Sequence, residues 1–303
     1  MAHRPPRDDT ADAEHHGGPG DPTRRRFLLG AGLAGAALAG AGALARDAGD
    51  EVRGRYTGSV VLITGATSGI GEATAHAYAR EGARVCFCGR REDRGRAVQE
   101  AIRADGGDAT FVAADVRDEA AVRELVEACV DTYGGLDIAF NNAGIAGPRG
   151  LLDEIELEGD GGYHDVFRTN VDGVMFGMRY QMPVMRRNGG GVIVNTGSML
   201  SHRGSVFAGA YAGSKHAVIG LTRSAAATYA SEGVRVISVS PAGVETELLR
   251  EFLGGSLEGA GDDTPMGRIA QPHEVAAVVL NLTAPEATFL NGDDIRVDGA
   301  SSA

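Results

Sequence analysis

The chain has 303 residues, of which 43% are apolar and 23% are charged, so it can bury a sizeable core and wholesale disorder is excluded. Its formal net charge of −12 at pH 7 argues against nucleic acid and anionic membrane surfaces as partners. Three cysteines are too few and too scattered for a disulfide scaffold or a four-ligand zinc site, and no metal is expected. What remains is an acidic, Gly-rich globular protein.

The first residues differ in character from the rest of the chain. Residues 1–22 are polar and rich in Pro, Gly and charge, and we expect them to be disordered. Arg24 and Arg25 then precede Phe27, a Gly/Ala-rich apolar stretch and a small-x-small site at residues 43–45. This order resembles a twin-arginine export signal.

The resemblance implies a periplasmic or extracellular protein that meets the twin-arginine translocase during export. Residues 1–45 would then be a tail with a cleavable signal, and residues 46–55 a linker. Two alternatives stay open. One is an N-terminal membrane anchor, because the apolar stretch at residues 28–45 approaches the length needed to span a bilayer. The other is a cytoplasmic protein with a polar tail.

From residue 56 onward, short apolar runs alternate with longer amphipathic stretches. The runs predicted to form buried strands are Val60–Ile63, Val85–Cys88, Thr110–Ala113, Ile138–Phe140, Val192–Val194 and Val234–Val239. The stretches predicted to form helices are Glu72–Glu81, Arg94–Ala104, Glu119–Thr132 and Ala217–Ser231. Repeated strand–helix units predict an α/β fold: one domain over residues 56–303 with a doubly wound parallel sheet of about seven strands and helices on both faces.

The first predicted strand leads directly into a glycine-rich turn at residues 64–71. A strand, a glycine turn and a helix start together form a cradle for a pyrophosphate, because glycines let the backbone approach and helix N–H groups face the anion. The turn therefore predicts a dinucleotide cofactor. Its candidate binding residues are Gly65, Thr67, Ser68, Gly69, Ile70 and Gly71.

Tyr211 and Lys215 lie four residues apart on a predicted helix and so share a face. A nearby ammonium and the positive charge of a nicotinamide cofactor lower a tyrosine pKa from its usual value of about 10, which suits Tyr211 to exchange a proton with a carbonyl or alcohol oxygen. Ser198, at the end of a predicted strand, would hydrogen-bond that oxygen, with Ser201 and Ser205 as rivals. Lys215 is the only lysine beside 28 arginines, which argues against a chance surface pair.

Three motifs in order resemble the short-chain dehydrogenase/reductase family over about residues 56–300: the TGxxxGxG turn, the sequence NNAG at residues 141–144, and Tyr211-x-x-x-Lys215. The resemblance implies a Rossmann fold and an NAD(P)-dependent oxidoreductase that interconverts an alcohol and a ketone or aldehyde. It assigns Asn170 to holding a water that links Lys215 to solvent, which completes a catalytic tetrad with Ser198 and Tyr211. Two departures are Pro241-Ala242 in place of Pro-Gly, and VDGA in place of VDGG at residues 297–300.

The same resemblance implies further cofactor contacts. It places Asp115 at the adenine and the NNAG backbone at the adenosine ribose. The cofactor contacts that the resemblance adds are Asp115, Val116, Asn142, Ala143, Gly144, Tyr211, Lys215, Pro241, Gly243, Val244 and Thr246.

Cofactor choice depends on the end of the second predicted strand. Enzymes that use NAD usually carry Asp or Glu there, to bind the ribose hydroxyls, but this chain has Gly89 followed by Arg90. A guanidinium suits a 2′-phosphate through charge-assisted hydrogen bonds. The sequence therefore favours NADP(H), with NAD(H) as the alternative. The plainest interpretation is that Arg90 and Arg91 are loop residues without a role in cofactor binding.

The substrate is expected to be a small-molecule alcohol or carbonyl compound, bound by residues 199–210 and 247–264. The resemblance also implies a homodimer or homotetramer formed through helices near 163–188 and 209–231 and the C-terminal segment. An apolar surface of Ala217, Val218, Leu221 and Ala225 is consistent with such burial. Cys86 and Cys88 are expected to be buried packing residues.

Two other classes of function stay open at this point. One is a catalytically silent nucleotide-binding sensor or scaffold of the same fold. The presence of all four tetrad residues argues against it. The other is a structural protein of the cell envelope, suggested only by the export signal.

Overall fold

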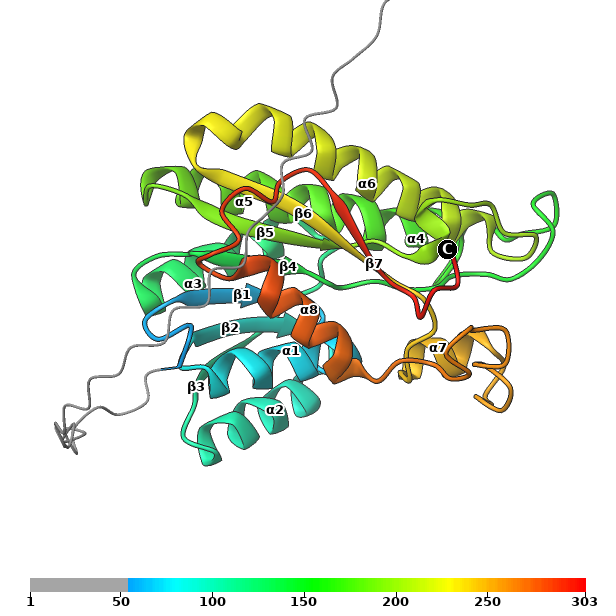
Figure 1. The fold of residues 1–303 in the computed structure, drawn as a ribbon, viewed down its shortest axis with the longest axis horizontal. Helices are drawn as coiled ribbons and strands as arrows, with labels where there is room; N and C mark the ends of the chain where they lie inside the picture. Colours follow the sequence, from blue (N-terminus) through cyan, green and yellow to red (C-terminus); the bar gives the residue numbers. More distant parts are fainter. Residues whose placement is uncertain (1–53) are drawn as a thin grey trace, which may run out of the picture. The chain divides into compact units, whose positions relative to one another are not determined.

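The computed structural model describes residues 54–303, so the predicted tail and export signal, and all but the end of the predicted linker, lie outside the described residues. Seven strands form one fully parallel sheet in the order β3-β2-β1-β4-β5-β6-β7 (Figure 1). The strands are β1 (Val60–Ile63), β2 (Arg84–Gly89), β3 (Asp108–Ala113), β4 (Ile138–Asn141), β5 (Gly191–Thr196), β6 (Val234–Pro241) and β7 (Asp294–Val297).

Helices cover both faces of the sheet, as the sequence predicts (Figure 1). One face carries α1 (Gly69–Arg80), α2 (Glu92–Ala104) and α8 (Pro272–Thr283), which pack on it through one apolar cluster. The other face carries α3 (Glu119–Tyr133), α5 (Gly173–Arg187) and α6 (Gly209–Tyr229), packed through a second cluster. Two further α-helices are short, α4 (Tyr163–Phe167) and α7 (Glu247–Phe252). The predicted doubly wound Rossmann-type sheet is confirmed.

Two helices differ from their predicted extents. The helix that the apolar pattern predicts at 217–231 begins eight residues earlier, at Gly209, where the family resemblance places its start. The apolar pattern misses the first turns because they are rich in Gly and Ser. The long helix expected at 163–188 is interrupted by a π-helical turn at Arg168–Asp172, which periodicity alone does not reveal. Both differences matter for the site, since they set the positions of Tyr211 and Asn170.

Only part of the apolar surface predicted on α6 is accessible to another subunit. Val218 and Ala225 are buried in the core of the same chain, so they cannot form a surface between subunits. Ala217 and Leu221 are half-buried. The oligomeric state therefore stays a prediction that rests on the family resemblance, without support from Val218 and Ala225.

All three cysteines are free and buried, which confirms the packing role expected of Cys86 and Cys88. The neighbouring thiol of Cys129, together with burial, raises the pKa of Cys86. Such thiols stay protonated and unreactive. Within residues 54–303, none of the helices combines the length and apolar character needed to span a bilayer.

Candidate active site

The predicted site residues meet at the edge where the parallel strands end. The glycine turn follows β1, Asp115 follows β3, the NNAG segment includes the end of β4, and Ser198 follows β5. The sheet order reverses direction between β1 and β4, which lie side by side (Figure 1). Ligands of open α/β sheets bind at such a switch point, outside the carboxyl ends of the strands.

The glycine turn is fitted tightly against the segment that follows β4. Gly65 has a φ of +68°, and a Cβ on it would lie 2.7 Å from the Cα of Ala143. A Cβ on Gly71 would lie 2.4 Å from the carbonyl oxygen of Gly65. Asn142 ties the two segments together, because its side-chain amide donates to the carbonyls of Thr64 and Gly65, both at 3.1 Å. Only glycine fits at positions 65 and 71.

The start of α1 suits the pyrophosphate of a dinucleotide. Ser68 stands at the N-cap but makes no side-chain cap, whereas Asp118 caps α3 by accepting from the amide of Ala120 at 2.8 Å. The first amides of α1 thus face the strand-end edge without a side-chain acceptor. Thr246 stands over this turn, since its Cγ2 lies 3.0 Å from the Cβ position of Gly69. These residues fit a nucleotide cofactor.

Lys215 and Tyr211 lie together under this edge. The side chain of Lys215 is buried, and its Nζ donates to the carbonyl oxygen of Thr196 at 2.7 Å. The same Nζ is 5.6 Å from the centroid of the Tyr211 ring. The Ser198 side chain lies close enough to Tyr211 to lower the pKa of its hydroxyl, whereas its rival Ser201 accepts from the backbone amide of Ser198 at 2.9 Å. Ser198, not Ser201, therefore faces Tyr211.

Asn170 is held inside the π-helical turn by a full set of hydrogen bonds. Its Nδ2 donates to the carbonyl of Ile145 at 2.9 Å and to the hydroxyl of Ser214 at 3.0 Å, and its Oδ1 accepts from the amide of Ile145 at 2.9 Å. A Cβ on Gly144 would lie 3.2 Å from Asn170 Oδ1 and 3.7 Å from Lys215 Nζ. All four predicted catalytic residues thus belong to one site.

Burial, rather than the lysine charge, sets the titration of the pair. Burial raises the pKa of Tyr211 above its usual value, and the neighbouring Ser198 side chain opposes this. Burial lowers the pKa of Lys215 from 10.5 to about 8. The sequence predicts that Lys215 and the positive charge of a bound nicotinamide together lower the pKa of Tyr211. The protein alone does not produce that shift, because desolvation of the phenolate outweighs an ammonium that lies beyond hydrogen-bond reach of the ring.

Charged pairs surround Asp115, the residue that the resemblance places at the adenine. Partial burial disfavours the Asp115 carboxylate, but hydrogen bonds from Arg117 outweigh this and lower the pKa of Asp115. Arg117 also donates to Asp165 at 2.7 Å. The charge of Arg90 acts on the same two carboxylates. Arg91, by contrast, reaches back to the glycine turn and donates to the hydroxyl of Ser68 at 2.7 Å.

The other predicted cofactor residues line the same strand-end edge or support it. Val116 and Val244 are buried, Pro241 pairs with Val297 in the sheet, and Gly243 packs against Ile269.

Sequence reasoning missed three supporting residues. Thr196 holds Lys215 through a backbone carbonyl, which leaves no trace in the side-chain pattern. Ser214 bridges Asn170 to the backbone of Tyr211, to whose carbonyl it donates at 2.7 Å. Its place directly before Lys215 was the available signal. Arg117 lies two residues after Asp115, a spacing that also could have been noticed.

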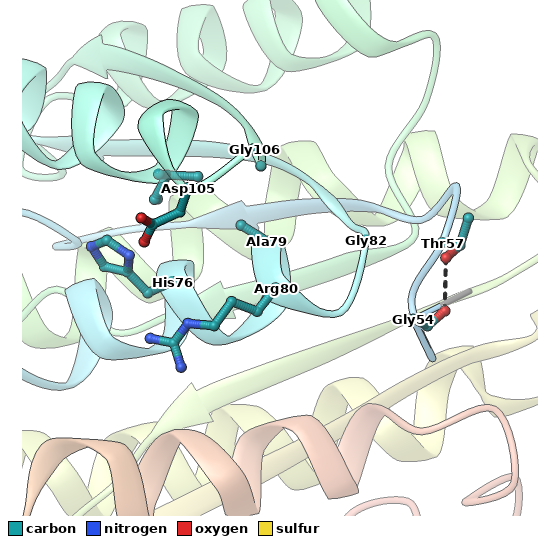
Figure 2. Close-up of a pocket in the computed structure, with 10 residues that line it drawn as sticks. Gly54, Thr57, His76, Ala79, Arg80, Gly82, Asp105 and Gly106 are labelled. Atoms are coloured by element: carbon teal, nitrogen blue, oxygen red, sulfur yellow. Dashed lines mark hydrogen bonds between the residues drawn. The ribbon is translucent and has the colours of Figure 1, made fainter. Parts of the chain in front are cut away.

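A separate pocket of about 660 Å³ lies at the other end of the strands, where β1 and β2 begin and α1 and α2 end. Figure 2 shows His76 and Arg80 of α1 beside Asp105, with Gly54 and Thr57 on the other wall. None of the predicted site residues lines it, so it has no part in the site.

Known proteins resemble this chain over nearly the whole strand–helix region. A family model described as enoyl-(acyl carrier protein) reductase matches residues 65–301. A cyclohexanol dehydrogenase from Acinetobacter sp. is 37% identical over 246 residues, which cover 81% of this chain and 96% of that protein. A 3β-hydroxysteroid dehydrogenase from Mediterraneibacter gnavus is 36% identical over 272 residues, which cover 83% and 97%.

Solved structures agree with the sequence comparisons. The structure of 3-ketoacyl-(acyl-carrier-protein) reductase from Brucella melitensis, complexed with NADH, superposes with a TM-score of 0.76 and 33% identity. The match covers 82% of this chain and 99% of that one.

Proposed function

The chain belongs to the short-chain dehydrogenase/reductase family of NAD(P)-dependent oxidoreductases, and from this we propose that it interconverts an alcohol and a ketone or aldehyde, with Tyr211 as acid and base. The observation that supports this most is the meeting of Tyr211, Ser198, Lys215 and Asn170 at the strand-end edge, beside a glycine turn that fits a dinucleotide. A sensor or scaffold has no need of a buried lysine beside a tyrosine.

The proposed roles follow from the contacts. When bound, the nicotinamide cofactor donates or accepts the hydride. Ser198 and Tyr211 together hold the substrate oxygen, and Tyr211 gives it a proton in reduction or takes one in oxidation. Lys215 places a positive charge near the phenolate that forms, and its Nζ is fixed by the carbonyl of Thr196. The family resemblance gives Asn170 the water that returns the proton to solvent, and because both hydrogens of its side-chain amide are donated to Ile145 and Ser214, it would hold that water as an acceptor.

The substrate side is apolar, which favours a bulky alcohol or ketone. Val206 and Phe207 are 70% and 52% exposed, and Leu152 lies against Gly209, two residues before Tyr211. An apolar surface that remains exposed beside a catalytic group suits an apolar ligand. Two of the relatives named above are, by their names, dehydrogenases of cyclohexanol and of a 3β-hydroxysteroid. We therefore extend the proposal to alicyclic alcohols and ketones.

The test of this function is a change in absorbance at 340 nm with a panel of alicyclic and linear alcohols and ketones, each with both cofactors. Turnover with one alicyclic pair supports the proposal. Binding of nucleotide without turnover of any member would instead favour the silent sensor.

Cofactor preference is proposed to be for NADP(H), with Arg90 as one contact of the 2′-phosphate. Arg90→Ala should weaken NADP(H) binding by about tenfold, because a charge-assisted hydrogen bond is lost, and should leave NAD(H) nearly unchanged. Isothermal titration with both nucleotides measures this. Equal losses for the two cofactors would show that Arg90 does not contact the phosphate.

Export by the twin-arginine route also stays a proposal, supported by the order of Arg24, Arg25, Phe27 and the site at residues 43–45. That route carries folded proteins and so suits a chain that closes around a nucleotide before leaving the cytoplasm. Cell fractionation and N-terminal sequencing should give a mature chain that starts at Arg46 outside the cytoplasmic membrane. Full-length cytosolic protein, unchanged by Arg24→Lys and Arg25→Lys, would refute export.

A further inference from the structure

One carboxylate from the substrate side crosses to the adenosine side of the site. Glu247 is the first residue of α7, directly after Thr246, which stands over the glycine turn. Its Oε2 accepts from Arg91 at 2.7 Å, and its Oε1 accepts from Arg94. These two hydrogen bonds lower the pKa of Glu247. The carboxylate is therefore charged at neutral pH and shared between two guanidinium groups.

Arg91 lies where the 2′-phosphate of NADP(H) would bind. It follows Gly89 and Arg90 at the end of β2, and its Nη2 donates to the hydroxyls of Ser68 at 2.7 Å and Thr67 at 3.3 Å. Its other terminal nitrogen, Nη1, is the one that Glu247 holds. The guanidinium thus has one edge on the dinucleotide turn and the other on a carboxylate.

We propose that Glu247 is a specificity-determining residue for the cofactor, which weakens the binding of NADP(H) relative to NAD(H) by competing with the 2′-phosphate for Arg91 and Arg94. The inference rests on the proposed function as an NAD(P)-dependent enzyme. It concerns a residue of α7, not of the strand end at Gly89, where an acidic group would ordinarily act on the ribose.

Glu247 weakens NADP(H) binding whether or not its side chain moves when the 2′-phosphate arrives. If Glu247 stays in place, its carboxylate repels a phosphate that approaches Arg91. If Glu247 moves away, its two ion pairs are lost. Either way the phosphate carries a cost that the ribose hydroxyl of NAD(H) does not. All three side chains are between 41% and 48% exposed, so solvent screens the effect and its size is modest.

The test compares Glu247→Gln with a matched control, Glu251→Gln, which removes the same charge from an exposed position on the same helix. Isothermal titration gives the Kd of each variant for NADP+ and for NAD+. We expect Glu247→Gln to tighten NADP+ binding about threefold or more, a change on the scale of an exposed ion pair, and to leave NAD+ nearly unchanged. Glu251→Gln should change neither.

A double variant identifies the partner. In an Arg91→Ala background the gain from Glu247→Gln should shrink, because one of the competing guanidinium groups is gone. Thermal melts check that each variant is folded. Equal shifts of the two nucleotides in Glu247→Gln, or the same NADP+ gain in Glu251→Gln, would overturn the inference. Failure of the unmodified protein to bind either nucleotide would instead refute the proposed function, so the two failures are distinct.

Discussion

Tyr211→Phe is expected to lower turnover by about a thousandfold, within the usual range for loss of a positioned acid or base. The change deletes only the hydroxyl that would exchange a proton with the substrate. The ring that lies 5.6 Å from Lys215 Nζ is kept, and so is the helix that carries both residues. Folding and nucleotide affinity should therefore persist. Steady-state rates at 340 nm and nucleotide titration measure the two effects separately.

The matched control is Tyr180→Phe, which removes a hydroxyl that donates to Glu119 at 2.7 Å on the exposed side of α5. This variant should retain full activity. If Tyr211→Phe also kept near-normal turnover, another group would have to supply the proton, and the roles proposed for Ser198 and Lys215 would lose their basis.

The fold could be predicted from the sequence because the strands are buried on both faces. Val60–Ile63 is continuously apolar and fully buried, and Val234–Val239 is mostly apolar and almost entirely buried, as a parallel sheet with helices on both sides requires. β7 has no such run: its residues are Asp-Ile-Arg-Val and it lies at the edge of the sheet, paired only with β6. No run in the sequence marked its bounds for that reason.

The site was predictable to the extent that its chemistry lies in side chains at fixed spacing. The Tyr211–Lys215 pair and the glycine turn are of this kind. Backbone contacts and long-range ion pairs are not. The carbonyl of Thr196 that fixes Lys215 depends on the end of β5, and Glu247 meets Arg91 across 156 residues of sequence. Such contacts depend on tertiary structure, and no local pattern encodes them.

Lys215→Met tests both the chemistry and the energetics of the buried ammonium. We expect turnover to fall by at least about a hundredfold, since no charge would remain to support the Tyr211 phenolate. At pH 7 the free energy of unfolding of Lys215→Met should be larger than that of the wild type. The lowering of the Lys215 pKa from 10.5 to about 8 corresponds to roughly 3 kcal/mol that folding loses while the charge is buried. The lost hydrogen bond to Thr196 offsets about 1 kcal/mol of this.

The pH dependence gives the sharper measurement. Below about pH 8 Lys215 is protonated in both the folded and the unfolded chain, so the cost of its burial is carried in full. Between about 8 and 10.5 the folded protein releases the proton that the unfolded chain still holds, so the stability of the wild type rises with pH. Above 10.5 both forms are neutral and the cost is gone.

Lys215→Met lacks this titration, and its stability serves as the reference at each pH. In urea unfolding, the variant should be the more stable protein at pH 7, and the wild type should gain on it steadily as the pH is raised from about 8 to 10.5. Parallel stability profiles for the two proteins would mean that the ammonium is solvated in the folded state. In that case Lys215 could not be the buried charge on which the proposed role of Tyr211 depends.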